Sequence, residues 1–251
     1  MRIRLDKYLA DAGMGTRSEA KKFIAAGRVS VNGAVVRDPG CKVSEEDPVS
    51  MNGRPVRYAA FEYYLLNKPQ GVISATHDEA RGAVCVTDLI EDGIRKDLFP
   101  VGRLDKDTEG LLLITNDGNL CHRLLSPKNH VDKTYYVELD GLLTEDMIRV
   151  LEEGVDIGDD AFTRPCRIEW PISMQCRGES SALSGADACC ITIHEGRYHQ
   201  IKRMFKMQGR NVIFLKRLSM GPLTLDNTLA PGQYRRLTQE ELAALKTAAG
   251  R

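Results

Sequence analysis

The chain has 251 residues, and its 35 basic and 35 acidic side chains give a formal net charge of zero at pH 7. It is long enough for one large domain or two smaller domains with a core, and its 42% of hydrophobic residues is typical of a globular protein. No apolar run approaches the length of a membrane span, and the charged first residues are unlike a signal peptide, so we expect a cytoplasmic protein without a membrane partner.

Two short helices are predicted at the start of the chain. Apolar residues at helical spacing over Leu5–Leu9 predict the first helix, which Gly13 or Gly15 ends. Ser18 is expected to cap the second helix, and Gly27 is a natural stop for it.

A hairpin is predicted next. Val29–Val36 contains two strand-like runs around Asn32-Gly33, and Asn-Gly is the strongest short signal for a hairpin. Residues 39–61 are rich in turn-forming residues and are expected to finish this module or to link it onward. We therefore expect a small domain over residues 1–58 and a larger domain over residues 59–251.

The small domain resembles the RNA-binding module first described in small-subunit ribosomal protein S-four. The resemblance rests on Leu5–Leu9, Ser18–Ala20 and Gly27–Gly33. It implies contact with structured RNA through shape and phosphates. The side chains expected to make these contacts are Arg17, Lys21, Lys22 and Arg28. The alternative for these residues is a solvated, charged helix face.

The pattern of the larger domain favours an α+β fold. Strands are predicted over residues 61–66, 111–115, 133–139, 188–194, 211–218 and 232–237, and helices over 117–125, 144–153, a basic stretch ending near 208, and 238–249. Residues 78–98 are mixed and indicate no clear element, and residues 154–185 indicate only short strands and loops around Trp170-Pro171. Strands dominate and do not alternate regularly with helices, which favours a mixed, mostly antiparallel sheet with flanking helices and a central cleft.

A polar loop from Val101 to Gly110 precedes the apolar strand at 111–115 and carries Asp105. A loop that leads into a buried strand can hold a reactive group in place. Arg103 lies two residues earlier, and in an extended segment the two side chains point the same way. A neighbouring cation keeps a carboxylate ionised, as a nucleophile requires, and an ordinary loop salt bridge has the same pattern.

Charge is distributed unevenly along the larger domain. The segment 138–160 is strongly acidic, whereas the segment 195–217 is strongly basic. This pattern is typical of a protein that binds a polyanion on one face and stays soluble on the other. None of the seven cysteines forms a Cys-x-x-Cys pair, so we expect reduced thiols and no metal site.

Four separated motifs together resemble those of the pseudouridine synthases. They are Asn67–Gly71, Gly102–Asp105, Lys133–Tyr135 and Gly196–Lys202. With its N-terminal module, the chain is similar over nearly its whole length to the RsuA family of ribosomal-RNA pseudouridine synthases. That resemblance implies conversion of a uridine in RNA to its carbon-linked isomer, without a cofactor, after the base has left the stack.

The resemblance also implies roles for individual residues. Asp105 is expected to attack the ribose anomeric carbon or to remove a neighbouring ribose proton, and both routes stay open. Tyr135 is expected to stack on the flipped uracil and to help remove the proton from its carbon-5. Lys202 is expected to pair with Asp105, with Arg203 as the alternative partner. The residues expected to contact RNA phosphates or bases here are Arg103, Arg197, His199 and Arg203.

The expected partner is small-subunit (16S) ribosomal RNA, and the enzyme is expected to be a monomer. Cys121–Pro127 and Gly196–Gln200 resemble the small-subunit enzymes more than their large-subunit relatives. The first alternative is the same reaction on large-subunit (23S) ribosomal RNA. The second alternative is a non-catalytic RNA-binding protein of ribosome assembly.

Overall fold

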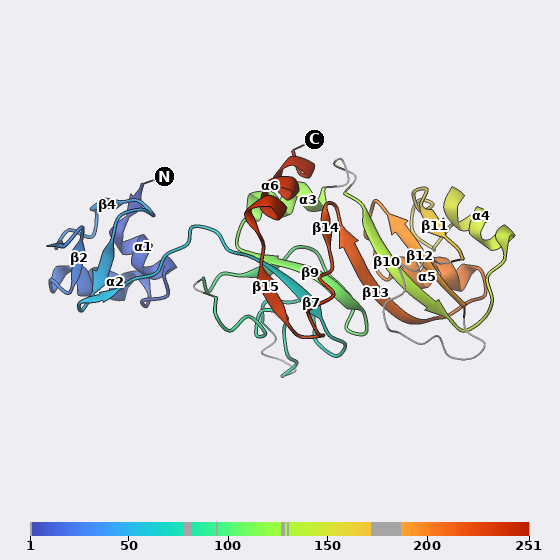
Figure 1. Ribbon diagram of the computed structural model, residues 1–251, viewed down its shortest axis with the longest axis horizontal. Coiled ribbons are helices and arrows are strands. Elements are labelled where there is room, and N and C mark those ends of the chain that lie inside the picture. Colours follow the sequence, from blue (N-terminus) through green and yellow to red (C-terminus); the bar gives the residue numbers. More distant parts are fainter. Residues whose placement is uncertain are drawn as a thin grey trace. The chain divides into compact units, whose positions relative to one another are not determined.

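The computed structural model describes residues 2–77, 82–93, 95–126, 129, 131–171 and 187–250 (Figure 1). The chain divides into two compact units. The first comprises Met1–Glu62, Ile90–Leu98 and Thr115–Asp117, and the second comprises Tyr63–Leu89, Phe99–Ile114 and Gly118–Arg251. No helix within the described ranges is long and apolar enough to cross a membrane.

The first unit begins with helices α1 (Leu5–Asp11) and α2 (Arg17–Ala25). The prediction that Ser18 caps α2 was wrong. Thr16 is the last extended residue, and its hydroxyl accepts a hydrogen bond from the Glu19 backbone N–H while the Glu19 carboxylate accepts one from the Thr16 N–H. This reciprocal arrangement satisfies two backbone donors at once, which Ser18, already inside the helix, cannot do.

The predicted hairpin is confirmed as β2 (Val29–Val31) and β3 (Ala34–Val35). Asn32 and Gly33 between the strands have φ angles of 51° and 82°, the left-handed values that a tight two-residue hairpin turn requires.

The turn-rich segment 39–61 contributes more to the module than its composition indicates. It contains the short strands β4 (Lys42–Val43), β5 (Val49–Met51) and β6 (Arg54–Pro55). Strands β5 and β6 extend the hairpin into a four-stranded sheet of order β3-β2-β5-β6, and β4 pairs with β1 (Ile3–Arg4).

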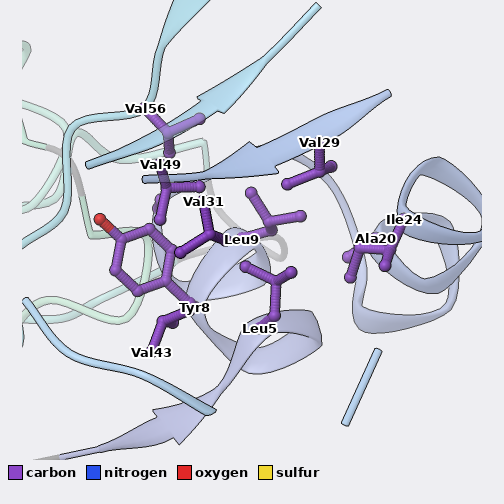
Figure 2. Close-up of a cluster of buried hydrophobic side chains, with 11 residues drawn as sticks. Leu5, Tyr8, Leu9, Ala20, Ile24, Val29, Val31, Val43, Val49 and Val56 are labelled. Carbon is purple, nitrogen blue, oxygen red and sulfur yellow. The ribbon is translucent and has the colours of Figure 1, made fainter. Parts of the chain in front are cut away.

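The core of the first unit lies between α1, α2 and these strands (Figure 2). Leu5, Tyr8 and Leu9 project from α1 toward Val31 and Val49 on β2 and β5 (Figure 2). All five are at most 9% exposed. Burial of this apolar surface is what holds together helices too short to be stable alone.

The second unit is built on a nine-stranded sheet (Figure 1). Its strands are β7 (Tyr63–Lys68), β8 (Phe99–Pro100), β9 (Glu109–Thr115), β10 (Lys133–Leu139), β11 (Arg167–Glu169), β12 (Asp187–Ile193), β13 (Val212–Met220), β14 (Leu223–Thr224) and β15 (Tyr234–Arg236). The main order is β11-β12-β10-β13-β9-β7-β15, with β14 on β13 and β8 on β9. Strands β10, β12 and β13 pair antiparallel, whereas β13 and β9 are parallel. The predicted α+β class with a mixed, mostly antiparallel sheet is confirmed.

Helices flank this sheet. They are α3 (Gly118–Leu125), α4 (Glu145–Glu153), α5 (Gln200–Met207) and α6 (Gln239–Ala248). α3 and α6 pack through Leu120, Leu124 and Leu245 against Leu111 and Leu113 of β9. The predicted helix starts at Thr144 and Thr238 are confirmed, since both hydroxyls accept a hydrogen bond from the first turn. Within the segments 78–98 and 154–185, residues 78–81, 94 and 172–185 lie outside the described residues.

A close backbone contact joins the two halves of the sheet. Gly110 on β9 faces Arg217 on β13, and a Cβ atom at Gly110 would lie 2.2 Å from the Arg217 carbonyl oxygen. The φ angle of Gly110 is +101°, which other residues rarely adopt. Arg217 in turn faces Tyr135 on β10. One row across the sheet therefore connects the strand after the Asp105 loop with the strand that carries Tyr135.

Candidate active site

The Asp105 loop is anchored by a buried lysine. Lys68, at the end of β7, is fully buried, and its ammonium group donates hydrogen bonds to the carbonyl oxygens of Pro69 at 3.0 Å, Asp105 at 3.0 Å and Thr108 at 2.9 Å. Burial lowers the pKa of Lys68 to about 8, so the group still carries its proton at neutral pH. A charged donor thus fixes the backbone on both sides of the Asp105 turn.

The carboxylate of Asp105 meets a side chain of α5. Lys202 Nζ lies 3.0 Å from Asp105 Oδ2 and 2.5 Å from Asp107 Oδ1. Burial opposes the charge on Lys202, but hydrogen bonds to Asp107 and Asp105 outweigh it and raise the pKa of Lys202. The structure thus brings together the predicted pair of Asp105 and Lys202. It also reveals Asp107 as a second carboxylate on the same ammonium.

His199 approaches the other side of this carboxylate. Its Nε2 lies 3.5 Å from Asp105 Oδ1. His199 is the residue before α5, and its backbone has a left-handed φ of 49°. Such a conformation is strained for a residue with a side chain and is concentrated at functional sites. The sequence predicted His199 as an RNA contact, and the structure places it directly beside Asp105.

The position of Tyr135 follows from the strand register. It is 7% exposed, and it faces Ile191 of β12 on one side and Arg217 of β13 on the other. The register shifts between Thr134 and Tyr135, and such irregularities re-aim side chains beside active sites. The described interactions include no contact between Tyr135 and Asp105. Their connection runs through the strand register, in which Tyr135 faces Arg217 and Arg217 faces Gly110, five residues after Asp105.

Two of the arginines predicted to bind RNA make extensive contacts with the protein. Arg197 donates to the carbonyl oxygens of Ala161 at 2.6 Å and Phe162 at 2.7 Å. Arg203 contacts Asp159 at 2.7 Å and also donates to the carbonyl oxygen of Ile157. Both guanidinium groups therefore hold the segment 157–162 against the start of α5, and their contact with RNA stays a prediction.

Arg103 differs from these two arginines. Its side chain is exposed, and it makes no ion pair among the described residues. The loop spacing left open an ion pair between Arg103 and Asp105, but among the described residues the cations beside the Asp105 carboxylate are Lys202 and His199. Arg103 thus has a charge available for another partner. The contact of Arg103 with RNA stays a prediction.

The four basic residues predicted to bind RNA in the first unit are all exposed. Arg17 and Lys21 lie one helical turn apart on α2, so their side chains share one face. Arg17 also lies 3.4 Å from the buried Asp6. Arg28 hydrogen-bonds Asn52 at 2.8 Å and lies over the ring of Phe23. Lys22 directly follows Lys21 on α2, so its side chain lies off the face that Arg17 and Lys21 share.

Two buried cations near Tyr135 were not predicted from the sequence. Arg217 is 2% exposed, and its Nε donates to the Leu111 carbonyl oxygen at 2.6 Å. Lys133 donates to the Val131 carbonyl oxygen, and burial, followed by the charge of Arg217, lowers its pKa to about 8. The signal in the sequence was a basic residue inside an apolar strand, which is exceptional unless it is hydrogen-bonded.

Comparison with known proteins identifies the family. The model of the RNA pseudouridylate synthase family matches residues 62–207, and the S4 domain model matches residues 3–49. A Bacillus subtilis protein named uncharacterized RNA pseudouridine synthase YtzG is 47% identical over 97% of this chain and 98% of its own length. Ribosomal small subunit pseudouridine synthase A of Vibrio cholerae is 40% identical, covering 97% of this chain and 99% of that protein.

Two further comparisons agree with this assignment. Ribosomal large subunit pseudouridine synthase B of Bacillus subtilis is 39% identical over 98% of this chain and 96% of its own length. The crystal structure of a pseudouridylate synthase, 34% identical, has a TM-score of 0.65 and covers 97% of this chain and 99% of that one. The chain therefore belongs to the RNA pseudouridylate synthase family, enzymes that isomerise uridine to pseudouridine, and it carries an S4 domain at its N-terminal end.

Proposed function

We propose that this enzyme isomerises a uridine of small-subunit ribosomal RNA and that Asp105, Tyr135 and Lys202 are its catalytic residues. The observation that carries the proposal is the position of the Asp105 carboxylate between Lys202 Nζ at 3.0 Å and His199 Nε2 at 3.5 Å. The loop that bears this carboxylate is held by the buried Lys68. A reactive group fixed by its surroundings in this way loses little freedom when substrate binds.

The reaction breaks the bond between the uracil nitrogen and the ribose and forms a bond from the ribose to uracil carbon-5. Carbon-5 loses a proton, and the released nitrogen gains one, so the overall change is an isomerisation. Asp105 begins the reaction by attack on the anomeric carbon or by removal of a neighbouring ribose proton. Lys202 supplies a positive charge next to the acid in either route.

Tyr135 has the chemical groups that the second half of the reaction needs. Its ring can stack on a uracil that has left the RNA helix, and its hydroxyl can relay the proton from carbon-5 by giving up its own proton as it takes that one. Its location on β10, opposite Arg217 in the row that includes Gly110, supports this role.

The RNA-binding part of the proposal rests on exposed cations. Arg17, Lys21, Lys22 and Arg28 of the first unit are exposed, and the S4 domain match covers all four. Such side chains position an RNA through its phosphates and do not read its sequence. Arg103, an exposed cation two residues before Asp105, is proposed to contact a phosphate beside the target nucleotide.

The choice of the small subunit rests on sequence resemblance within Gly196–Gln200 and Cys121–Pro127. Overall identity does not decide between targets, because relatives named for the small and the large subunit are 40% and 39% identical to this chain. Large-subunit ribosomal RNA is therefore the second candidate. The monomeric state and the cytoplasmic location stay predictions.

Release of tritium from RNA labelled at uracil carbon-5 tests the catalytic proposal. Asp105→Asn keeps the size of the side chain but removes its charge, so we expect RNA affinity to persist and tritium release to fall by at least about 1,000-fold. Asp146→Asn on the exposed face of α4 is the matched control, since it removes a carboxylate that is 85% exposed. Equal release by Asp105→Asn and by the control would contradict the proposal.

Mapping of pseudouridine in ribosomal RNA from a strain lacking the gene tests the target. We expect one small-subunit position to lose its modification and to regain it when the wild-type gene is restored. Restoration with the Asp105→Asn variant should leave the position unmodified. An unchanged small-subunit map together with a lost large-subunit position would transfer the proposal to the large subunit.

A further inference from the structure

A second aromatic surface lies next to the Asp105 carboxylate. Tyr198 is 76% exposed, and its ring stacks on the imidazole of His199 with a centroid distance of 3.9 Å and an interplanar angle of 17°. The imidazole Nε2 is in turn 3.5 Å from Asp105 Oδ1. His199 covers one face of the tyrosine ring, and the high exposure of Tyr198 leaves its other face to solvent.

The backbone that carries this pair is held rigidly, although the tyrosine side chain is exposed. Arg203 donates to the Tyr198 carbonyl oxygen at 3.1 Å, and the Arg197 backbone N–H donates to the Gln200 side chain at 3.0 Å. Arg197 also binds the carbonyl oxygen of Phe162. Because these contacts fix the segment before any partner binds, little conformational entropy is lost when the ring is covered.

The surroundings of the stack suit a nucleic acid better than an apolar partner. Lys206 follows Lys202 by one turn of α5 and is exposed, and its ammonium group has no hydrogen-bond or ion-pair partner in the described part of the chain. A planar ring beside cations is the combination that holds single-stranded RNA, since bases stack on the ring while phosphates meet the charges.

We propose that the Tyr198–His199 stack is a platform for the base of a nucleotide that flanks the flipped uridine. The inference rests on the proposed function and adds a subsite to it. The site next to Asp105 receives the reacting base, and the exposed face of Tyr198 replaces the stacking that a neighbouring base loses when the uridine swings out. Tyr198 is a positioning residue and takes no part in bond breaking.

Steady-state tritium release tests this platform with Tyr198→Leu and Tyr198→Phe. The substrate is carbon-5-tritiated small-subunit ribosomal RNA from the deletion strain. Loss of one base–aromatic stack predicts a KM increase of roughly 5- to 150-fold for Tyr198→Leu, with kcat within about twofold of wild type. Tyr198→Phe retains the ring and should restore the wild-type KM. Leu142→Ala, which shortens another exposed apolar side chain of the second unit, is the matched control.

A binding experiment separates failure of the platform from failure of the proposed function. Each variant is titrated with single-stranded polyuridylate carrying 2-aminopurine, whose fluorescence is quenched on stacking. We expect wild type and Tyr198→Phe to quench equally at saturation, and Tyr198→Leu to quench less because only stacking at other rings, such as Tyr135, remains. A wild type that quenches 2-aminopurine but releases no tritium would overturn the function and keep the platform. Equal quenching and equal KM for wild type and Tyr198→Leu would overturn the platform, as would equal defects in Tyr198→Leu and Tyr198→Phe.

Discussion

Replacement of Lys68 by methionine should destabilise the second unit and remove a distinctive pH dependence. The ammonium group donates to the carbonyl oxygens of Pro69, Asp105 and Thr108, which methionine leaves without this donor. Each buried carbonyl left unpaired costs about 1–3 kcal/mol. Removal of the buried charge offsets part of this cost. We expect a net loss of about 3 kcal/mol in the free energy of unfolding at pH 7.

The pH dependence follows from the depressed pKa of Lys68. Moving a lysine pKa from 10.5 to about 8 corresponds to about 3 kcal/mol, at about 1.4 kcal/mol per pH unit. Between pH 8 and 10.5 the unfolded chain keeps the proton that the folded protein has released, so the stability of the wild type rises with pH. Below pH 8 both states are protonated, and this contribution is constant. The difference in free energy of unfolding between wild type and Lys68→Met should therefore grow by about 3 kcal/mol from pH 8 to pH 10.5.

Urea denaturation at a series of pH values measures this difference, with Trp170 fluorescence as the probe. Trp170 is the single tryptophan of the chain and lies in the second unit. Other groups also titrate in this range or above it, such as Cys189, whose pKa burial raises to about 12. Their contributions to the pH dependence are the same in wild type and variant, so they cancel from the difference. Lys106→Met, which replaces an exposed lysine of the same loop, is the control and should change stability by less than about 0.5 kcal/mol. A difference that stays constant from pH 8 to 10.5 would refute the reasoning.

Three further substitutions test separate parts of the structure. Gly110→Ala places a methyl group 2.2 Å from the facing carbonyl oxygen of β13. In urea titrations this variant should lose more than about 4 kcal/mol in free energy of unfolding. The control Gly118→Ala, whose new methyl group meets nothing within 4 Å, should lose none. Thr238→Ala removes the cap of α6 and should cost about 1 kcal/mol in thermal unfolding; a change below about 0.3 kcal/mol would contradict the capping role. Asp107→Asn removes one carboxylate from Lys202 and should lower the pKa of that lysine, so the alkaline limb of kcat/KM for tritium release should move to lower pH; an unmoved limb would show that Asp107 does not hold Lys202.

The sequence predicted the helices and strands that are long enough for their hydrophobic period to repeat. Strand β10 and helix α4 were predicted to within a residue, because seven to nine residues show their period clearly. The strands of two or three residues within 39–61 were missed, since so few residues cannot show alternation. Among the site residues, the pairing of Asp105 with Lys202 followed from motif resemblance.

The remaining site contacts depend on tertiary structure, and no local pattern indicates them. Lys68 belonged to the Asn67–Gly71 motif but had no predicted role, and only the fold shows that it is buried against the carbonyls of a loop 37 residues away. The same holds for Arg217, which reaches across to Leu111 at a separation of 106 residues. Asp107 was interpreted only as one of the polar residues of the loop, because the sequence spacing does not show that Lys202 of α5 approaches that loop.

The glycine of β9 limits which sequences can build this enzyme. The two parallel strands approach so closely at Gly110 that a side chain would overlap the opposite backbone. A glycine five positions after Asp105, the proposed catalytic acid, is therefore a steric requirement of this architecture, independent of any contact with substrate. A chain that has the acid but a bulky residue at that offset must either separate the strands or orient its acid differently, so this offset offers a physical criterion for recognising relatives that have lost the reaction.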